Sequence, residues 1–337
     1  MKIFVENYLF GRALMSKNNY PEIGLKIGIE IHQQLKGTKL YCRCPTNMTI
    51  ARDFSVKRKM RLSKGEMGKV DAAAAQEIAK DKKFLYTGSI DHNCLVDLDE
   101  SPPQPISQSA LRTVLQVTKI VGATCVDVAQ VMRKLIVNGS TTSGFQRTTL
   151  IAGGGILHSS EGQVRIPTII IEEDSAQKLE SSNTEVEYSL DRLGIPLIEM
   201  TTEPDIRTPE QAKEVAEKIG MILRSTGGVR RGLGTIRQDV NISIAGGARI
   251  EIKGAQDLRM IPEYVRQEIK SQQELIALKK IYTTLKIKPC KPVDVSALFE
   301  TFKEKNEVVD VPNAKKLKDK DGKINFKNVY FTYPVNE

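Results

Sequence analysis

Alternation of apolar and polar side chains between Gly24 and Leu35 constrains the fold of this 337-residue chain more than any other feature. Successive side chains of a β-strand point to opposite faces, so Glu30 and His32 would share one face. The apolar positions of the other face are Leu25, Ile27, Ile29 and Ile31. We therefore predict a strand that buries one face and presents Glu30 and His32 together on the other.

The other strand-like segments do not alternate regularly with helices. They cover residues 129–137, 164–172, 196–201, 235–244 and 248–253. Some follow one another through polar turns that contain glycine, such as Ala245-Gly-Gly247. This order is typical of an antiparallel sheet rather than of βαβ units. We predict an α+β fold, with a large, mainly antiparallel sheet and flanking helices.

Helical periodicity appears in residues 70–80, after Ser107, after Thr208 and in residues 261–285. The third of these has the clearest start signal. Thr208 can cap the helix, Pro209 suits its first position and Gln211 completes a capping box. Its apolar stripe is Ala212, Val215, Ala216, Ile219 and Leu223. Gly227-Gly228 is expected to end it.

The two ends of the chain differ from its middle. Residues 1–20 show little pattern and are interpreted as an N-terminal leader, too short and interrupted in its apolar run for a signal peptide. One domain is expected over residues 21–290. The stretch 303–327 is rich in lysine and weakly patterned, so residues 291–337 are interpreted as an appended segment or a lysine-rich tail.

Composition narrows the functional classes only moderately. A net charge of +9 favours a polyanionic partner, although ordinary surface lysines explain it equally well. Aromatic residues make up 5% of the chain and Trp is absent, which argues against nucleic-acid binding by base stacking. No apolar run approaches the ~20 residues that span a bilayer. The odd number of cysteines, five, indicates a reduced, cytoplasmic setting.

Three places concentrate acidic side chains that could hold a metal ion. Glu30 and His32 can share a metal or a proton. The segment Ile169-Ile-Ile-Glu-Glu-Asp174 brings three acids together, and Mg²⁺ prefers carboxylate oxygens. Glu199 lies within an apolar strand and needs a partner if it is buried. The alternatives are a solvated strand face, a polar strand end and a structural ion pair.

A pair of polar strands could hold phosphate. Alternation places Arg237 on one face of the segment 235–244, and Arg249 and Lys253 on one face of the next segment. Arginine and lysine bind phosphate through charge-assisted hydrogen bonds. The chain has no G-x-x-x-x-G-K-[ST] sequence, so its nucleotide binding would not use a P-loop.

Cysteines offer a second candidate metal site. Cys42, Cys44 and Cys94 could supply three thiolates to Zn²⁺, which takes four ligands in a closed site. His92 or Asp97 could be the fourth ligand. Free cysteines without a metal are the alternative, because a second close cysteine pair is missing.

A serine-based amidase is not indicated, since the chain has no G-x-S-x-G elbow and no serine-rich glycine stretch with a nearby lysine. If the chemistry uses ammonia, another protein must therefore produce it.

Taken in order, six segments of the chain resemble the GatB/GatE family. They are Gly24–Leu35, Leu40–Pro45, Val131–Lys134 with Gly139–Arg147, Ile171–Asp174, Asp191–Asp205 and Arg231–Gly254. The sequence Ser143-Gly-Phe-Gln-Arg147 and the Gln-Gln pair after His32 favour the E type over the bacterial B type. Ordered matches over this length are more specific than any single motif.

This resemblance implies the catalytic subunit of a Glu-tRNA(Gln) amidotransferase, an ATP-dependent carbon–nitrogen ligase. ATP, with Mg²⁺, would phosphorylate the γ-carboxylate of glutamate on misacylated tRNA(Gln). Ammonia from a GatD-like asparaginase/amidase subunit would then displace the phosphate and give Gln-tRNA(Gln). A hetero-oligomer with that subunit is expected, and the domain over residues 21–290 would be the catalytic cradle.

By motif, the resemblance also implies roles for individual residues. His32, Glu173 and Glu199 would be catalytic and hold the metal, with Glu30 as an additional metal ligand. The phosphate of ATP or the tRNA 3′ end would contact Arg237, Arg249 and Lys253. Many B-type relatives carry a four-cysteine zinc site in the region of Cys42, Cys44 and Cys94. Asp97 stands at the fourth position here, so zinc binding and a metal-free cluster both remain open.

E-type proteins continue into further domains that grip the tRNA, and residues 293–299 resemble the start of the first of these. Two hypotheses follow. The chain is either an active catalytic subunit or a catalytically incomplete fragment that serves as a scaffold or tRNA-binding partner of a GatD-like amidase.

Overall fold

The computed structural model describes residues 20–49, 51–59 and 68–285. Apart from Tyr20, the expected leader 1–20 lies outside these residues, as does the expected tail 291–337. The chain divides into two compact units, Met1–Ile281 and Tyr282–Glu337, and every strand named below belongs to the first.

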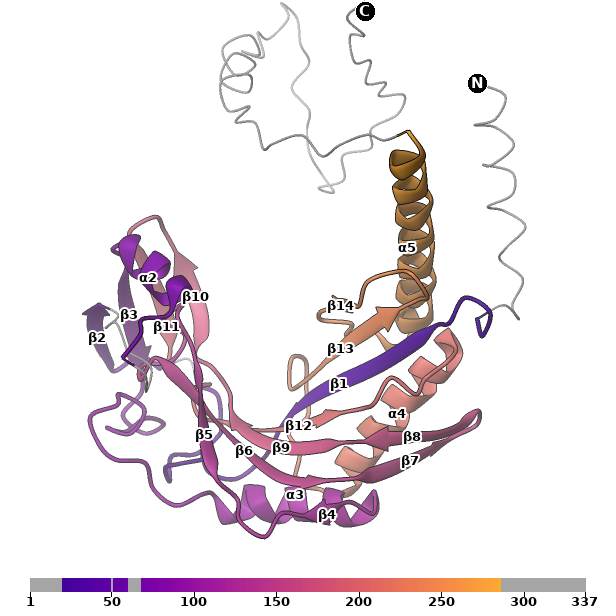
Figure 1. The fold of residues 1–337 in the computed structure, drawn as a ribbon. Helices are drawn as coiled ribbons and strands as arrows, with labels where there is room; N and C mark the ends of the chain where they lie inside the picture. The colour runs from indigo at the N-terminus through magenta and orange to yellow at the C-terminus, as the bar shows by residue number, and fades with distance from the viewer. Residues whose placement is uncertain (1–19, 50, 60–67, 286–337) are drawn as a thin grey trace, which may run out of the picture. The chain divides into compact units, whose positions relative to one another are not determined.

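A large antiparallel sheet of eight strands dominates the first unit (Figure 1). Its spatial order is β14 (Ile250–Ile252), β13 (Ile236–Ser243), β1 (Lys26–Gln34), β12 (Pro196–Thr201), β9 (Thr168–Glu173), β6 (Phe145–Gly153) and β4 (Thr124–Cys125), with β5 (Val131–Leu135) also paired to β6. All of its pairings are antiparallel. This sheet with its helices confirms the predicted α+β fold.

The two faces of the large sheet differ, as the alternation in β1 predicts. Ile27, Ile29 and Ile31 are fully or almost fully buried in the main hydrophobic core. Helices α3 (Gln108–Ile120) and α4 (Pro209–Ser225) cover this apolar face (Figure 1). The face opposite these helices is called the polar face below.

Within the described part of the chain, a smaller sheet of four strands and a two-stranded hairpin complete the β-structure. The sheet has the order β10 (Gln177–Ser181), β11 (Glu185–Ser189), β3 (Lys83–Gly88) and β2 (Phe54–Lys59), and its β11–β3 pairing is parallel. The hairpin consists of β7 (Gly155–Ser159) and β8 (Gly162–Ile166). The single strand predicted over 164–172 is therefore wrong, since β8 and β9 belong to different sheets. Pro167 separates them because proline has no N–H to donate to a ladder.

Helices form where their start signals predict them. The Thr208 side chain accepts a hydrogen bond from the Gln211 N–H at 3.1 Å, and Pro209 is the first residue of α4. The predicted stripe of α4 is buried, and the helix ends at Ser225, two residues before Gly227, which has a φ of +68°. The other helices among the residues described are α2 (Ala72–Ala79), a short 3₁₀ helix (Leu258–Met260) and α5 (Ile261–Thr284).

Candidate functional site

Three neighbouring strands place His32 at the middle of the polar face. In the antiparallel register, His32 on β1 lies opposite Glu199 on β12 and opposite Arg237 on β13. Side chains that lie directly opposite one another across a ladder point to the same face. The pairing thus brings together three predicted site residues that are far apart in the sequence.

Three carboxylates lie close to one nitrogen of the His32 imidazole. His32 Nε2 lies 3.3 Å from Glu199 Oε2, 3.5 Å from Glu30 Oε1 and 3.6 Å from Glu172 Oε1. The Thr148 hydroxyl on β6 donates a hydrogen bond to Glu172 Oε2 at 3.0 Å and fixes that carboxylate. These four residues, Glu30, His32, Glu172 and Glu199, are called the acidic cluster.

Glu172, and not Glu173, is the acid of β9 that belongs to the acidic cluster, which corrects the prediction. Ile169 and Ile171 are buried in the core, so alternation turns Glu173 toward the same apolar side and Glu172 toward His32. The sequence itself contained this signal. The buried isoleucines that precede the three acids determine which face of the strand each acid occupies.

Glu173 instead forms an ion pair with Arg147. Its carboxylate accepts hydrogen bonds from Arg147 Nη1 at 3.1 Å and from the Arg147 N–H at 3.2 Å. The Arg147 guanidinium lies over the rings of Tyr41 and Phe145, at 5.7 and 5.4 Å from their centroids. This largely buried pair lies on the opposite face of β9 from Glu172 and His32.

Electrostatics in the acidic cluster favour a bound proton or cation. Burial, followed by the charge of Glu199, raises the pKa of Glu30 and that of Glu172. Burial lowers the pKa of His32, but its hydrogen bond and charge interaction with Glu199 and the charges of the other two carboxylates raise it above its usual value overall. Three acids around one imidazole leave an excess of negative charge.

The donor atoms of the acidic cluster suit one metal ion. One atom each from Glu30, His32 and Glu199 lies within 4.8 Å of the others. Glu172 adds a further carboxylate beside His32. Carboxylate oxygens are the ligands that Mg²⁺ prefers, and a divalent cation would balance the excess negative charge. The residues present therefore fit Mg²⁺.

Predicted phosphate ligands do not converge on one point. Arg237 Nη2 lies 3.1 Å from Asp174 Oδ1. Lys253 Nζ lies 3.0 Å from Glu251 Oε2 and 3.4 Å from Asp239 Oδ2.

Arg249 precedes β14, is exposed, and has no ion pair among the residues that the structure describes. Of these three residues, only Arg237 lies directly opposite a member of the acidic cluster in the strand register, and that member is His32.

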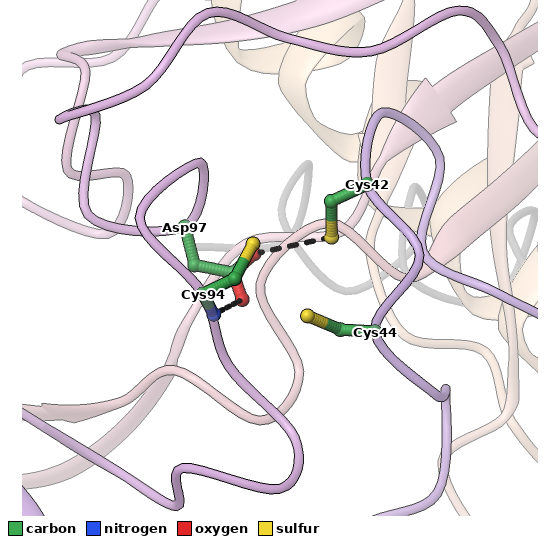
Figure 2. A group of neighbouring side chains, drawn as sticks. All are labelled: Cys42, Cys44, Cys94 and Asp97. Atoms are coloured by element: carbon green, nitrogen blue, oxygen red, sulfur yellow. Dashed lines mark hydrogen bonds between the residues drawn. The ribbon is translucent and has the colours of Figure 1, made fainter.

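A second cluster brings together the cysteines singled out in the sequence. Cys42 and Cys44 come from the segment after β1, and Cys94 and Asp97 from the segment after β3 (Figure 2). One donor atom of each residue lies within 4.8 Å of the others. Hydrogen bonding with Cys44, and then burial, raises the pKa of the Cys42 thiol. His92 is not part of this group.

Asp97 is oriented by a buried lysine that the sequence analysis did not single out. Asp97 Oδ2 accepts hydrogen bonds from Lys39 Nζ at 2.8 Å, Asn93 Nδ2 at 3.2 Å and the Cys94 N–H at 3.2 Å. Its other oxygen, Oδ1, faces Cys42 Sγ at 4.0 Å (Figure 2). Lys39 is fully buried and gave no pattern in the sequence.

This arrangement fits Zn²⁺. Three thiols and one carboxylate oxygen provide the four ligands of a closed tetrahedral site. Asp97 Oδ2 is occupied by three donors, so Oδ1 is the oxygen turned to the thiols. Three thiolates and a carboxylate around a divalent ion carry a net negative charge, and the buried Lys39 ammonium would offset part of it.

Among the described residues, no helix has the length and apolarity needed to cross a membrane.

Comparison with known proteins gives one family and a consistent group of relatives. The GatB/GatE catalytic domain family matches residues 25–329. The chain is 48% identical over 309 residues to the E-type subunit of the glutamyl-tRNA(Gln) amidotransferase of Methanocaldococcus jannaschii, covering 91% of this chain and 48% of the relative. It is 46% identical over 292 residues to the protein of the same name from Methanopyrus kandleri, covering 84% and 46%.

For the protein of that name from Saccharolobus solfataricus, identity is 51% over 267 residues, covering 79% and 42%. The chain spans about half the length of the curated relatives that it matches.

Proposed function

From the premise that this chain belongs to the GatB/GatE catalytic domain family, we propose that it is the catalytic subunit of a Glu-tRNA(Gln) amidotransferase. One observation carries the proposal. His32 lies among three carboxylates on the polar face, and Arg237 is its direct neighbour on the next strand. Phosphoryl transfer from a nucleotide uses a metal ion together with positively charged side chains, so a cation site beside an arginine suits it.

The proposed reaction has two steps. A γ-carboxylate oxygen of the glutamyl group attacks the γ-phosphorus of ATP, and ADP leaves, which converts the carboxylate into an acyl phosphate. Ammonia then attacks the acyl carbon, orthophosphate leaves, and the nitrogen loses a proton to give the amide of Gln-tRNA(Gln). Phosphorylation is needed because an ionised carboxylate is a poor electrophile and lacks a good leaving group.

The polar face supplies the groups for these steps. The acidic cluster, Glu30, His32, Glu172 and Glu199, would hold Mg²⁺. A bound Mg²⁺ would balance the negative charge of the phosphoryl group that is transferred. Glu30 has the most exposed side chain of the four, at 28%, and can accept the proton released by the nitrogen. Thr148 keeps Glu172 directed at His32.

A separate protein would provide the ammonia. The relatives are named as subunits, which favours a hetero-oligomer, and a GatD-like asparaginase/amidase is the partner that we infer. Because the proposed substrate is a tRNA, we also propose a cytoplasmic location. We also propose that Cys42, Cys44, Cys94 and Asp97 hold a structural zinc ion, on the strength of their donor geometry.

A second candidate function is that of a scaffold or tRNA-binding partner of an amidase that does not itself complete the reaction. The net charge of +9 favours a polyanionic partner such as tRNA. Ammonium chloride as nitrogen source separates the two functions, since it removes the need for the amidase. The purified chain would be incubated with ATP, Mg²⁺, Glu-tRNA(Gln) and ammonium chloride, and the aminoacyl group identified after deacylation.

Formation of glutamine supports the catalytic function, and His32→Ala should abolish it. His158→Ala is the matched control, because His158 is exposed on the β7–β8 hairpin. If no glutamine forms with the chain alone or with an amidase partner, the scaffold function replaces the catalytic one.

A further inference from the structure

Strand β5 forms part of the outer border of the large sheet. One of its edges pairs with β6, and among the residues that the structure describes no strand pairs with the other. All five residues of β5 are exposed. Within the same residues, their backbone groups make no hydrogen bond to backbone outside this ladder. Such an edge offers a row of donors and acceptors to an extended peptide segment.

An apolar groove adjoins β5 on the side of the sheet that carries α3. The groove encloses about 600 Å³. Val131, whose side chain is 44% exposed, lines it together with Phe145, Ile106 and Leu111. Ile106 and Leu111 also pack against the main hydrophobic core, so the groove is an open continuation of that core. A contiguous apolar surface of this kind marks a site of interaction with another molecule.

Positive charge is in excess around the groove. Arg133 of β5 lines it and has no ion pair among the residues described. Helix α3 carries Arg112 and Lys119 and contains no acidic residue. Asp99 is the one acid among the described lining residues, and Arg147, the other arginine of the lining, is already neutralised by its own ion pair. An occupant with negative charge would therefore be favoured.

Charge and symmetry narrow down which segment fits this edge. Arg133 is the central residue of β5. A second copy that paired antiparallel with β5 about a two-fold axis would place Arg133 opposite its own counterpart, and like charges directly opposite one another are destabilising. The lysine-rich stretch 303–327 of the chain has the same sign of charge as the groove. An acidic segment of another protein, apolar on one face, is complementary in charge and in polarity.

We propose that β5 and the adjoining groove, together called the β5 docking surface, bind an extended acidic segment of the subunit that supplies ammonia. The segment would add a strand to the outer edge of β5. Every second side chain of it would point to the same side as Val131 and Arg133. Apolar residues would then enter the groove, and a carboxylate would pair with Arg133. The identity of the partner rests on the proposed function, whereas the surface rests on the geometry of β5.

Hydrogen exchange of the intact proteins locates the surface. The full chain would be labelled alone, with the purified GatD-like amidase of the same organism, and with an acceptor-stem RNA ending in CCA. We expect the amidase to slow exchange of the backbone amides of residues 131–135 by about tenfold or more, because amides in an added ladder exchange only when that ladder opens. Amides of α4 should exchange at an unchanged rate. Protection of β5 by the RNA and not by the amidase would overturn the proposal.

Two substitutions on β5 test the groove and its charge separately. Val131→Glu places a negative charge at the apolar groove, and Arg133→Glu reverses the charge that would meet the acidic segment. We expect each to weaken amidase binding in isothermal titration calorimetry by about tenfold or more, because like charges brought together at an interface are strongly unfavourable. Met221→Glu is the matched control, since Met221 is 54% exposed on α4, which packs against β1 and β7. Thermal unfolding establishes that each variant is folded.

The nitrogen source separates a failure of the β5 docking surface from a failure of the proposed function. In Val131→Glu, glutamine formation should fall when the amidase and its amide substrate supply the nitrogen, but persist with ammonium chloride, which bypasses docking. Equal amidase affinity in Val131→Glu and Met221→Glu, or no amidase binding by the wild type, overturns the surface and leaves the proposed function intact. A wild-type chain that forms no glutamine from either source overturns the proposed function, and protection of β5 by the amidase still decides the surface.

Discussion

Glu172 and Glu173 are neighbours in the sequence, yet their carboxylates serve opposite faces of the large sheet. Glu172 Oε1 lies 3.6 Å from His32 Nε2 on the polar face, whereas Glu173 Oε1 lies 3.1 Å from Arg147 Nη1 on the other side. The same substitution at the two positions should therefore have different consequences.

Glu172→Gln should weaken Mg²⁺ binding with little change in stability. An amide keeps the shape of the side chain but removes one negative charge from the acidic cluster. We expect the affinity for Mg²⁺, or for Mn²⁺ as a spectroscopic substitute, to fall by about tenfold or more, the loss found even for residues that only support a ligand. Electron paramagnetic resonance of Mn²⁺ measures this directly.

Glu173→Gln should destabilise the fold and leave metal affinity unchanged. It removes the partner of Arg147, whose side chain is 12% exposed, and leaves a largely buried positive charge. The free energy of unfolding in urea should fall by about 3 kcal/mol. A loss of Mn²⁺ affinity in this variant, with Glu172→Gln unaffected, would reverse the two assignments.

The acidic cluster should make the metal-free protein less stable as the pH rises. The pKa values of Glu30, Glu172 and His32 are raised in the folded state. A group of this kind contributes stability below its unfolded pKa and loses that contribution as the pH rises through its folded pKa. The ordinary pKa is 4.5 for the two acids and 6.5 for His32. The free energy of unfolding should therefore fall as the pH rises above these values.

Urea unfolding between pH 6 and pH 8, in buffer without Mg²⁺, measures this effect. The unfolding free energy should fall across that range, and added Mg²⁺ should stabilise the protein more at pH 8 than at pH 6. Glu172→Gln should show a shallower slope, because it removes one acidic neighbour of His32. A slope that is flat in the wild type, or equally steep in Glu172→Gln, would contradict this view of the cluster.

Zinc content tests the thiol cluster independently of catalysis. We expect elemental analysis of the purified chain to find about one zinc ion per chain, as a four-ligand structural site requires. Cys94→Ser should lose the metal and unfold at a lower temperature. Cys125→Ser should keep it, because Cys125 is exposed on β4 and outside the cluster.

Lys39→Met gives the corresponding test of the buried ammonium. Removing it leaves Asp97 Oδ2 with two donors, Asn93 and the Cys94 N–H, and leaves the charge of the zinc centre without an offset, so the released fraction of zinc in a chelator titration should rise. Wild-type protein that contains no zinc and is insensitive to chelators would show a metal-free cluster held by the Lys39–Asp97 ion pair instead.

Much of the large sheet could be predicted because its strands have one buried and one polar face. The alternation of side chains in β1 predicted that Glu30 and His32 share one face. The predicted segment 196–201 has the same bounds as β12. The smaller sheet was missed, since its β11–β3 pairing joins segments about a hundred residues apart in the sequence.

The site was predicted less completely, for reasons of register and tertiary contact. The sequence could not establish that His32 lies opposite both Glu199 and Arg237, because register depends on how strands pair. Lys39 also escaped notice, since a lysine is normally exposed and only its contact with Asp97 explains its burial.

Positional isotope exchange tests the central claim most directly. ATP labelled with ¹⁸O in the β–γ bridge would be incubated with the chain, Mg²⁺ and Glu-tRNA(Gln) in the absence of ammonia. Reversible transfer to the γ-carboxylate frees the β-phosphate to rotate, so the label should scramble into the non-bridging β-oxygens. We predict scrambling that needs Glu-tRNA(Gln) and is lost in His32→Ala but kept in His158→Ala. Scrambling that persists undiminished in His32→Ala, or none in the wild type, would contradict the proposal that this polar face carries out the phosphorylation.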